Sequence, residues 1–184
     1  MTKGTFEDFI GIWDNNVDEN ICKELIKYYD WTIENNYNID PNIDGDHEHL
    51  IDREDEAIFI GSSSPQYPDN LCNQYWGCLE QCVQEYMTKY RIQIVGVLHS
   101  WMFKVHKVKE KQGYHVWHYE NGGYEVRDRF LVFQTYLQAP SEGGETEFLF
   151  QSKKIDPVKI NELLNEHHLF VIIGSILFAN YMVL

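Results

Sequence analysis

The sequence predicts an α+β fold in which helices pack against one face of a mainly antiparallel double sheet. Apolar residues recur at helical spacing before residue 92, and after it they alternate with polar residues between glycine turns. The 184 residues suit one domain, and a hydrophobic content of 43% is ample for a packed core. We expect one domain over 1–184, with a helical preface and loop over 1–91 and a β-rich core over 92–184.

Two segments near the start of the chain have apolar residues at helical spacing. The first covers Phe6 to Trp13, where the side chains of Phe6, Phe9, Ile10 and Trp13 fall at helical spacing. The second begins after Asp18, whose carboxylate can cap a helix that has Trp31 near its end. Its apolar face would consist of Ile21, Leu25, Ile26 and Tyr29.

A polar loop and a second long helix follow. Residues 33–56 are rich in Asn and Asp and are interpreted as loop. Pro68 opens a helix that reaches about Tyr90. The side chains available for burial are those of Leu71, Tyr75, Cys78, Leu79, Cys82 and Met87. The four cysteines of the chain are expected to be reduced and partly buried thiols: Cys22, Cys72, Cys78 and Cys82.

The segment Gly113 to Glu120 has the pattern of a strand and carries the main chemical signal. Side chains alternate between the faces of a strand, so His118 and Glu120 are expected on one face. One imidazole and one carboxylate are two of the three ligands in the His₂-carboxylate site that binds Fe(II) and leaves positions open. The alternative for His118 is an ordinary surface or core histidine with one hydrogen bond.

Three other histidines compete for this role. His115 is odd-spaced from His118 and would face away on a regular strand. His106 precedes a lysine-rich turn and is expected near the mouth of a pocket. Neither of these, nor His99, displaces His118 unless a bulge intervenes.

Downstream motifs extend the pattern. A β-rich run over Arg129–Leu137 ends in Tyr136-Leu137, and a Gly143-Gly144-Glu145-Thr146-Glu147-Phe148 motif follows it. With His118-x-Glu120 before them, these elements resemble the prolyl-4-hydroxylase-like branch of the 2-oxoglutarate/Fe(II)-dependent dioxygenases. The resemblance covers roughly residues 96 to 157.

This resemblance implies a fold and a site. The fold would be a double-stranded β-helix, or jelly roll, with two long supporting N-terminal helices. His118 and Glu120 would bind Fe(II), the Tyr136 hydroxyl would reach a carboxylate of 2-oxoglutarate, and Thr146 would line the co-substrate pocket. The activity would be hydroxylation of a prolyl, other peptidyl or small-molecule substrate, coupled to decarboxylation of 2-oxoglutarate to succinate.

Each of these residues also has a structural interpretation. Tyr136 could be a half-buried strand aromatic, and Thr146 could be a β-branched strand residue. Gly143-Gly144 could be a hairpin turn, because glycine adopts the positive φ that such turns need.

The chain also departs from the family pattern. The family uses Asp more often than the longer Glu at the position of Glu120. It places a distal His after the glycine-rich strand, with an Arg or Lys about nine residues later that pairs with 2-oxoglutarate. Here the last histidines are His167 and His168, after a helix-like stretch over 160–166, and the last basic residue is Lys159. The alternative function is therefore an inactive jelly-roll relative that acts as a binding or scaffold domain.

Residues 169–184 carry no charge, although 24% of the whole chain is charged. A membrane-spanning helix needs about 20 apolar residues, and this stretch is shorter and is broken by Gly174, Ser175 and Asn180. We expect a strand pair that closes the core. We also hypothesise that an early stop or a reading-frame change has altered this end, which would leave the jelly-roll core over 92–184 incomplete there.

Charge excludes some partners. The net charge is −14 and the isoelectric point is about 4.8. A nucleic-acid backbone demands a basic face, and anionic membranes attract basic segments, so neither partner is expected. The N-terminus shows no signal sequence, and a cytoplasmic location is expected.

Overall fold

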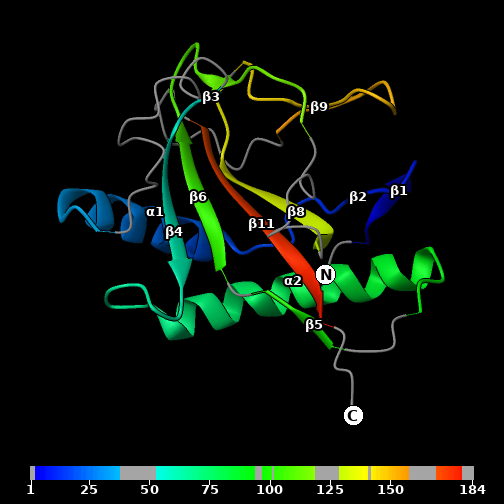
Figure 1. The fold of residues 1–184 in the computed structure, drawn as a ribbon, viewed down its shortest axis with the longest axis horizontal. Coiled ribbons are helices and arrows are strands. Elements are labelled where there is room, and N and C mark those ends of the chain that lie inside the picture. Colours follow the sequence, from blue (N-terminus) through cyan, green and yellow to red (C-terminus); the bar gives the residue numbers. More distant parts are fainter. Residues whose placement is uncertain are drawn as a thin grey trace.

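The computed structural model describes residues 3–37, 53–93, 97–100, 102–118, 129–140, 142–157 and 169–179. Two long helices, α1 (Glu19–Glu34) and α2 (Asp69–Lys89), run across the direction of the longest strands (Figure 1). The strands are β1 (Thr5–Glu7), β2 (Ile10–Ile12), β3 (Arg53–Glu54), β4 (Glu56–Gly61), β5 (Val97–His99), β6 (Met102–Val108), β7 (Gly113–Tyr114), β8 (Arg129–Gln138), β9 (Thr146–Phe148), β10 (Lys153–Ile155) and β11 (Leu169–Ala179).

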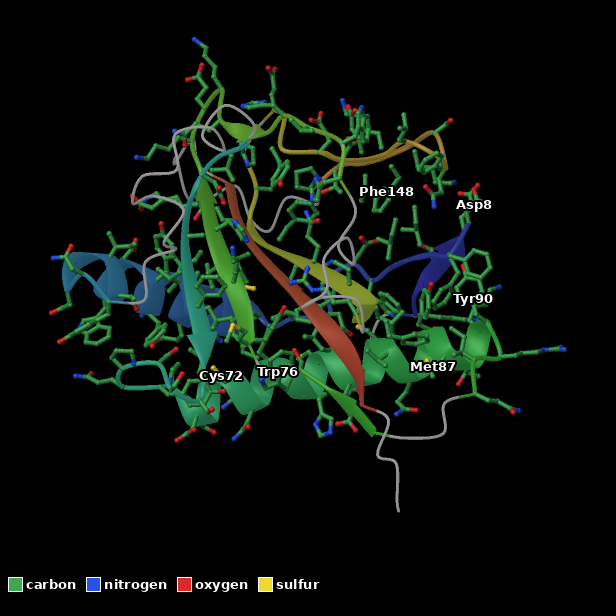
Figure 2. All side chains as sticks on the ribbon, viewed as in Figure 1. Asp8, Cys72, Trp76, Met87, Tyr90 and Phe148 are labelled. Atoms are coloured by element: carbon green, nitrogen blue, oxygen red, sulfur yellow. The ribbon has the colours of Figure 1, made fainter. Side chains whose placement is uncertain are left out.

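The helix expected over Phe6–Trp13 is wrong, because this segment is the β1–β2 hairpin. Asp8 and Phe9 form a two-residue turn with φ of 48° and 63°, the left-handed geometry that suits a tight hairpin. The aromatic spacing reflects packing on α2 instead. Phe6 meets Trp13 edge to face at 5.3 Å, and Phe9 stacks on Tyr90 at 4.7 Å. Figure 2 shows Asp8 at the hairpin tip, on the same side of the molecule as Tyr90.

Both long helices confirm the sequence prediction. Asp18 caps α1, and its carboxylate accepts a hydrogen bond of 2.8 Å from the Asn20 backbone N–H. Pro68 precedes α2, and the helix ends at Lys89. Each helix buries one face, which includes Ile21, Cys22, Leu25 and Tyr29 on α1 and Cys72, Tyr75 and Leu79 on α2.

The largest sheet is five-stranded and antiparallel, with β11 at its centre. β11 pairs on one side with β6 and then β5, and on the other side with β8. β4 pairs with β6 at the edge. The strand pair expected after residue 169 is thus one long central strand within the described residues. β4 was not predicted, because the expected loop ended at residue 56 and no element was assigned between it and the helix that begins at Pro68.

The core lies between the helices and one face of this sheet. Phe103 of β6 contacts Tyr75 and Trp76 of α2, with ring centroids 5.3 Å apart in both pairs. The Tyr75 hydroxyl lies 2.8 Å from the hydroxyl of Thr135 on β8. Because side chains alternate along a strand, Lys104, His106, Gln134 and Tyr136 lie on the other side. We call this side the open face.

The structure supports the α+β class, but the closed jelly roll is not confirmed. Apart from the five-stranded sheet, the described residues form two-stranded sheets: β1–β2, β3–β7 and β9–β10. Within those residues no second sheet of comparable size covers the open face. In the described part of the chain, no helix has the length and apolar character needed to span a membrane.

The expected strand over Gly113–Glu120 is much shorter than predicted. β7 covers only Gly113–Tyr114, where it pairs with the two residues of β3. His118 follows on irregular backbone, and Glu120 lies outside the described residues. The His118 ring bonds back to the Val116 carbonyl two residues earlier. Such a local side-chain bond is typical of turns and competes with a sheet ladder.

Candidate co-substrate site

Two of the predicted site residues meet on the open face. Tyr136 lies near the end of β8, and Thr146 begins β9. Their hydroxyl oxygens are 2.6 Å apart. Gly143 and Gly144, with φ of 82° and 83°, lie in the connection between the two strands. These values lie in the left-handed region that glycine adopts without a steric penalty, so the glycine pair allows the chain to turn there.

A third polar side chain completes this group. Gln134, two residues before Tyr136 on the same face of β8, donates from Nε2 to Thr146 Oγ1 at 2.7 Å. Gln134 was not predicted, although its even spacing from Tyr136 is visible in the sequence. The hydroxyls of Tyr136 and Thr146 and the Gln134 amide place several hydrogen-bond donors within a small area. We call these three residues the hydroxyl cluster.

The hydroxyl cluster suits an anion. Burial, partly offset by hydrogen bonding with Thr146, raises the pKa of Tyr136, so its phenol stays protonated. Hydrogen bonds from neutral donors to a carboxylate are charge-assisted and are stronger than neutral pairs. The cluster therefore fits one carboxylate of a small acid.

His118 is exposed and lies on the irregular segment after β7. Its Nδ1 is 3.1 Å from the Val116 carbonyl oxygen, and its ring packs on Tyr114 with centroids 4.0 Å apart. A carbonyl can only accept, so this bond assigns the proton to Nδ1 and leaves Nε2 as the nitrogen with a lone pair. Metal-binding histidines commonly have this arrangement.

The rest of the predicted iron site lies outside the described residues. Glu120, His167 and His168 all fall there. Within the described ranges, no three side chains of His, Cys, Asp or Glu gather in a way that could hold a metal ion. The assignment of His118 and Glu120 to Fe(II) therefore stays a prediction.

His106 has a different environment from the one expected. Its Nδ1 forms a short hydrogen bond with the Asp55 carboxylate, and the two side chains are 9% and 7% exposed. The pair joins β6 to the residue that precedes β4. Sequence reasoning missed Asp55, since nothing local connects two residues that only strand pairing brings together. His115, the remaining rival near the motif, is exposed.

Strand pairing aligns His106 with Tyr136, and Lys104 with Gln134, in two rows of paired residues that cross the sheet. One row runs Ala57, His106, Val171 and Tyr136 across β4, β6, β11 and β8. The next row runs Phe59, Lys104, Ile173 and Gln134 across the same strands. Lys104 Nζ lies 4.4 Å from the centre of the Phe59 ring. Lys104 was not singled out by the sequence, because its row is set by long-range pairing.

Comparison with known proteins identifies the fold. No family model matches the chain, and no curated protein matches it. Two solved structures of a viral collagen prolyl hydroxylase from Paramecium Bursaria Chlorella virus-1 are similar to it. The complex of that enzyme with 2OG has a TM-score of 0.54 at 17% identity, covering 90% of this chain and 94% of the enzyme chain. A second structure, of a truncated form, has a TM-score of 0.53 at 16% identity, with 91% and 88% coverage. At these identities the likeness shows a prolyl-hydroxylase-like fold.

Proposed function

We propose that this protein is a 2-oxoglutarate- and Fe(II)-dependent dioxygenase that hydroxylates a prolyl, other peptidyl or small-molecule substrate. The observation that most supports this proposal is the 2.6 Å distance between the hydroxyl oxygens of Tyr136 and Thr146. These residues come from separate motifs, yet their hydroxyls meet on the open face. The viral enzyme of similar fold is described as a 2OG complex, which supports the co-substrate.

The chain's own residues would have three tasks. Tyr136, Thr146 and Gln134 would bind and orient a carboxylate of 2-oxoglutarate. His118 and Glu120 would hold Fe(II), with Nε2 of His118 as the donor atom. When bound, Fe(II) would supply an oxidation by O₂ in which 2-oxoglutarate loses CO₂ and takes up one oxygen atom to become succinate, while the other oxygen atom enters the substrate as a hydroxyl group. The half-buried Tyr136 would keep its phenol proton throughout.

The test is succinate formation by the full chain. Protein purified without oxygen is supplied with Fe(II), 2-oxoglutarate and then O₂, and succinate is measured. We expect slow turnover without substrate, and we expect His118→Ala to abolish it. His115→Ala is the matched control, since His115 is also exposed and lies three residues away. Succinate formation that persists in His118→Ala would contradict the assignment of the metal ligand.

A specific observation favours a second candidate, a domain that binds 2-oxoglutarate without turning it over. His118 is exposed and lies outside β7, whereas the hydroxyl cluster is in place. Calorimetric binding of 2-oxoglutarate that depends on Thr146, with no succinate at any Fe(II) concentration, would support this candidate. Succinate formation lost in His118→Ala would exclude it.

A further inference from the structure

We propose that Lys153 is a positioning residue, which holds the β9–β10 hairpin against the β1–β2 hairpin and so keeps Thr146 at the hydroxyl cluster. Lys153 Nζ lies 2.5 Å from a carboxylate oxygen of Glu7 and 3.6 Å from one of Asp8. Glu7 ends β1, and Asp8 lies in the turn to β2. The inference rests on the proposed function, in which Thr146 binds 2-oxoglutarate, and it gives the N-terminal hairpin a part in that binding.

Strand pairing places Lys153 and Thr146 on the same face of the β9–β10 hairpin. Lys153 is opposite Phe148, and Ile155 is opposite Thr146. Opposite residues of an antiparallel pair share a face, and so do residues two apart on one strand. Figure 2 shows Phe148 on the same side of the molecule as Asp8. The face thus contacts the rest of the protein at two points, because Thr146 bonds to β8 and Lys153 to β1–β2.

The two hairpins are not closely packed on each other. A cleft of about 280 Å³ lies between them, lined by Phe6, Ile10 and Ile12 on one side and by Lys153 and Ile155 on the other. Apolar side chains that face an unfilled space lose dispersion contacts. An isolated two-stranded hairpin is also marginally stable in water. The position of β9–β10 therefore depends on its polar contacts, and the ion pairs of Lys153 are the ones that join it to β1–β2.

The β1–β2 hairpin can serve as a support because α2 holds it. Glu85 of α2 accepts hydrogen bonds from Trp13 Nε1 at 2.7 Å and from the Gly4 backbone N–H at 3.2 Å. A charged acceptor makes such bonds stronger than neutral ones. Polar contacts thus lead from α2 through β1–β2 and Lys153 to Thr146.

Lys154, the next residue on β10, offers a matched control. Its Nζ lies 3.2 Å from Glu147 and 3.8 Å from Glu145, which both belong to the β9 side of the same hairpin. The Lys154 side chain is 52% exposed, whereas that of Lys153 is 20% exposed. Lys154→Met therefore removes the same charge from the same strand and breaks no described ion pair between the two hairpins.

Hydrogen exchange of the full chain without ligand tests whether Lys153 holds the hairpin. Protection of the β9 and β10 amides is measured in the wild type, Lys153→Met, Lys153→Arg, Glu7→Gln/Asp8→Asn and the combination of Lys153→Met with Glu7→Gln/Asp8→Asn. We expect Lys153→Met to lower protection about 2- to 5-fold, as for loss of an ion pair near the surface, and Lys153→Arg to retain it. The combination should be no worse than Lys153→Met alone, because the same contacts are lost. Lys154→Met and Glu7→Gln/Asp8→Asn should instead have effects that multiply.

Calorimetry with 2-oxoglutarate tests the consequence for Thr146. Lys153→Met should weaken binding about 2- to 5-fold, and the combined variant should again be no worse. If the wild type binds 2-oxoglutarate and Lys153→Met binds it equally tightly, the positioning role is overturned while the proposed function stands. Effects of Lys153→Met and Glu7→Gln/Asp8→Asn that multiply would overturn the ion pairs as the cause. A wild type that binds no 2-oxoglutarate would overturn the proposed function, and lowered exchange protection in Lys153→Met would still support the link between the hairpins.

Discussion

The contact between Tyr136 and Thr146 depends on one hydroxyl oxygen from each side chain. Thr146 Oγ1 accepts from Gln134 and lies within hydrogen-bond distance of the Tyr136 hydroxyl. The bond to Thr146 fixes the direction of the Tyr136 O–H group, which would otherwise rotate about its C–O bond. A carboxylate that bound at the cluster would meet the hydroxyl proton not used in the Tyr136–Thr146 bond and the second N–H of Gln134, both already positioned, so less conformational entropy would be lost on binding.

Replacing Tyr136 by Phe removes one oriented donor and keeps the ring. We expect the KM for 2-oxoglutarate to rise about 10-fold, since a hydrogen bond to a charged group is lost, while kcat changes little. Initial rates of succinate formation over a range of 2-oxoglutarate concentrations measure both constants. A fall in kcat with an unchanged KM would contradict a role for this hydroxyl in co-substrate binding.

The buried thiol of Cys22 predicts a loss of stability in alkali. Burial, assisted by the nearby Asp18 carboxylate, raises the pKa of Cys22 from 9.0 to about 12. The unfolded chain releases this proton above pH 9, whereas the folded chain keeps it until about pH 12. The contribution of the thiol to stability is therefore complete below pH 9 and declines above it, by at most about 1.4 kcal/mol per pH unit.

Urea unfolding between pH 8 and pH 11 measures this effect. The free energy of unfolding should fall more steeply for the wild type than for Cys22→Ala, whose cost from the lost side chain does not depend on pH. Cys82, with a pKa raised to about 11 chiefly by burial, adds a smaller decline that remains in the variant. Parallel curves for the two proteins would show that Cys22 does not titrate differently on folding.

At the scale of elements, the β1–β2 hairpin is tied to the end of α2 by one carboxylate. Glu85 accepts from Trp13 Nε1 at 2.7 Å and from the Gly4 backbone N–H at 3.2 Å. A charged acceptor that satisfies two donors holds a short hairpin that would not be stable alone. The aromatic contacts of Phe6 and Phe9 add apolar area to the same junction.

Glu85→Ala should release the hairpin. We expect a loss of about 2 kcal/mol in the free energy of unfolding, together with a red shift of tryptophan fluorescence as Trp13 becomes exposed to water. Glu80→Ala is the matched control on the same helix, because Glu80 is exposed. Equal effects of the two substitutions on fluorescence would argue against the contact between Glu85 and Trp13.

The elements also show what the sequence could and could not predict. Asp18 and Pro68 act through neighbours in the sequence, so both helix starts were predictable. Tyr136 and Thr146 could be singled out because they belong to recognisable motifs, and their role in binding stays a prediction. The β1–β2 hairpin was not found, because aromatic residues that pack on another element can mimic helical spacing. Lys104 and the His106–Asp55 pair depend on strand register, which no local pattern encodes.

At the scale of the whole molecule, the side chains that stabilise the fold and those proposed to bind a ligand lie on opposite faces of the five-stranded sheet. One face of the five-stranded sheet is packed against α1 and α2, while the hydroxyl cluster and the half-buried Lys104 lie on the other face. Exposed apolar side chains, including Met102, Phe130 and Val132, lie on the same open face. Substitutions on the open face should therefore affect ligand binding more than the packing of the helices.

A bound co-substrate should stabilise the whole fold. At 2-oxoglutarate concentrations about 100-fold above Kd, linkage gives about 2.7 kcal/mol of added stability. A thermal shift assay should show a higher Tm for the wild type and a much smaller shift for Thr146→Val, which keeps the side-chain shape without the hydroxyl. The same rise in Tm for both proteins would place the ligand elsewhere on the molecule.

β11 has a further consequence for how the protein is made. This strand comes last in the described chain, yet it lies between β6 and β8 and is hydrogen-bonded to both. During synthesis, the edges of β6 and β8 that pair with β11 keep unpaired backbone N–H and C=O groups until residues 169–179 leave the ribosome. Such edges invite pairing with other nascent chains. Ribosome-bound intermediates of this protein should therefore depend on chaperones until the final insertion joins the two halves of the sheet.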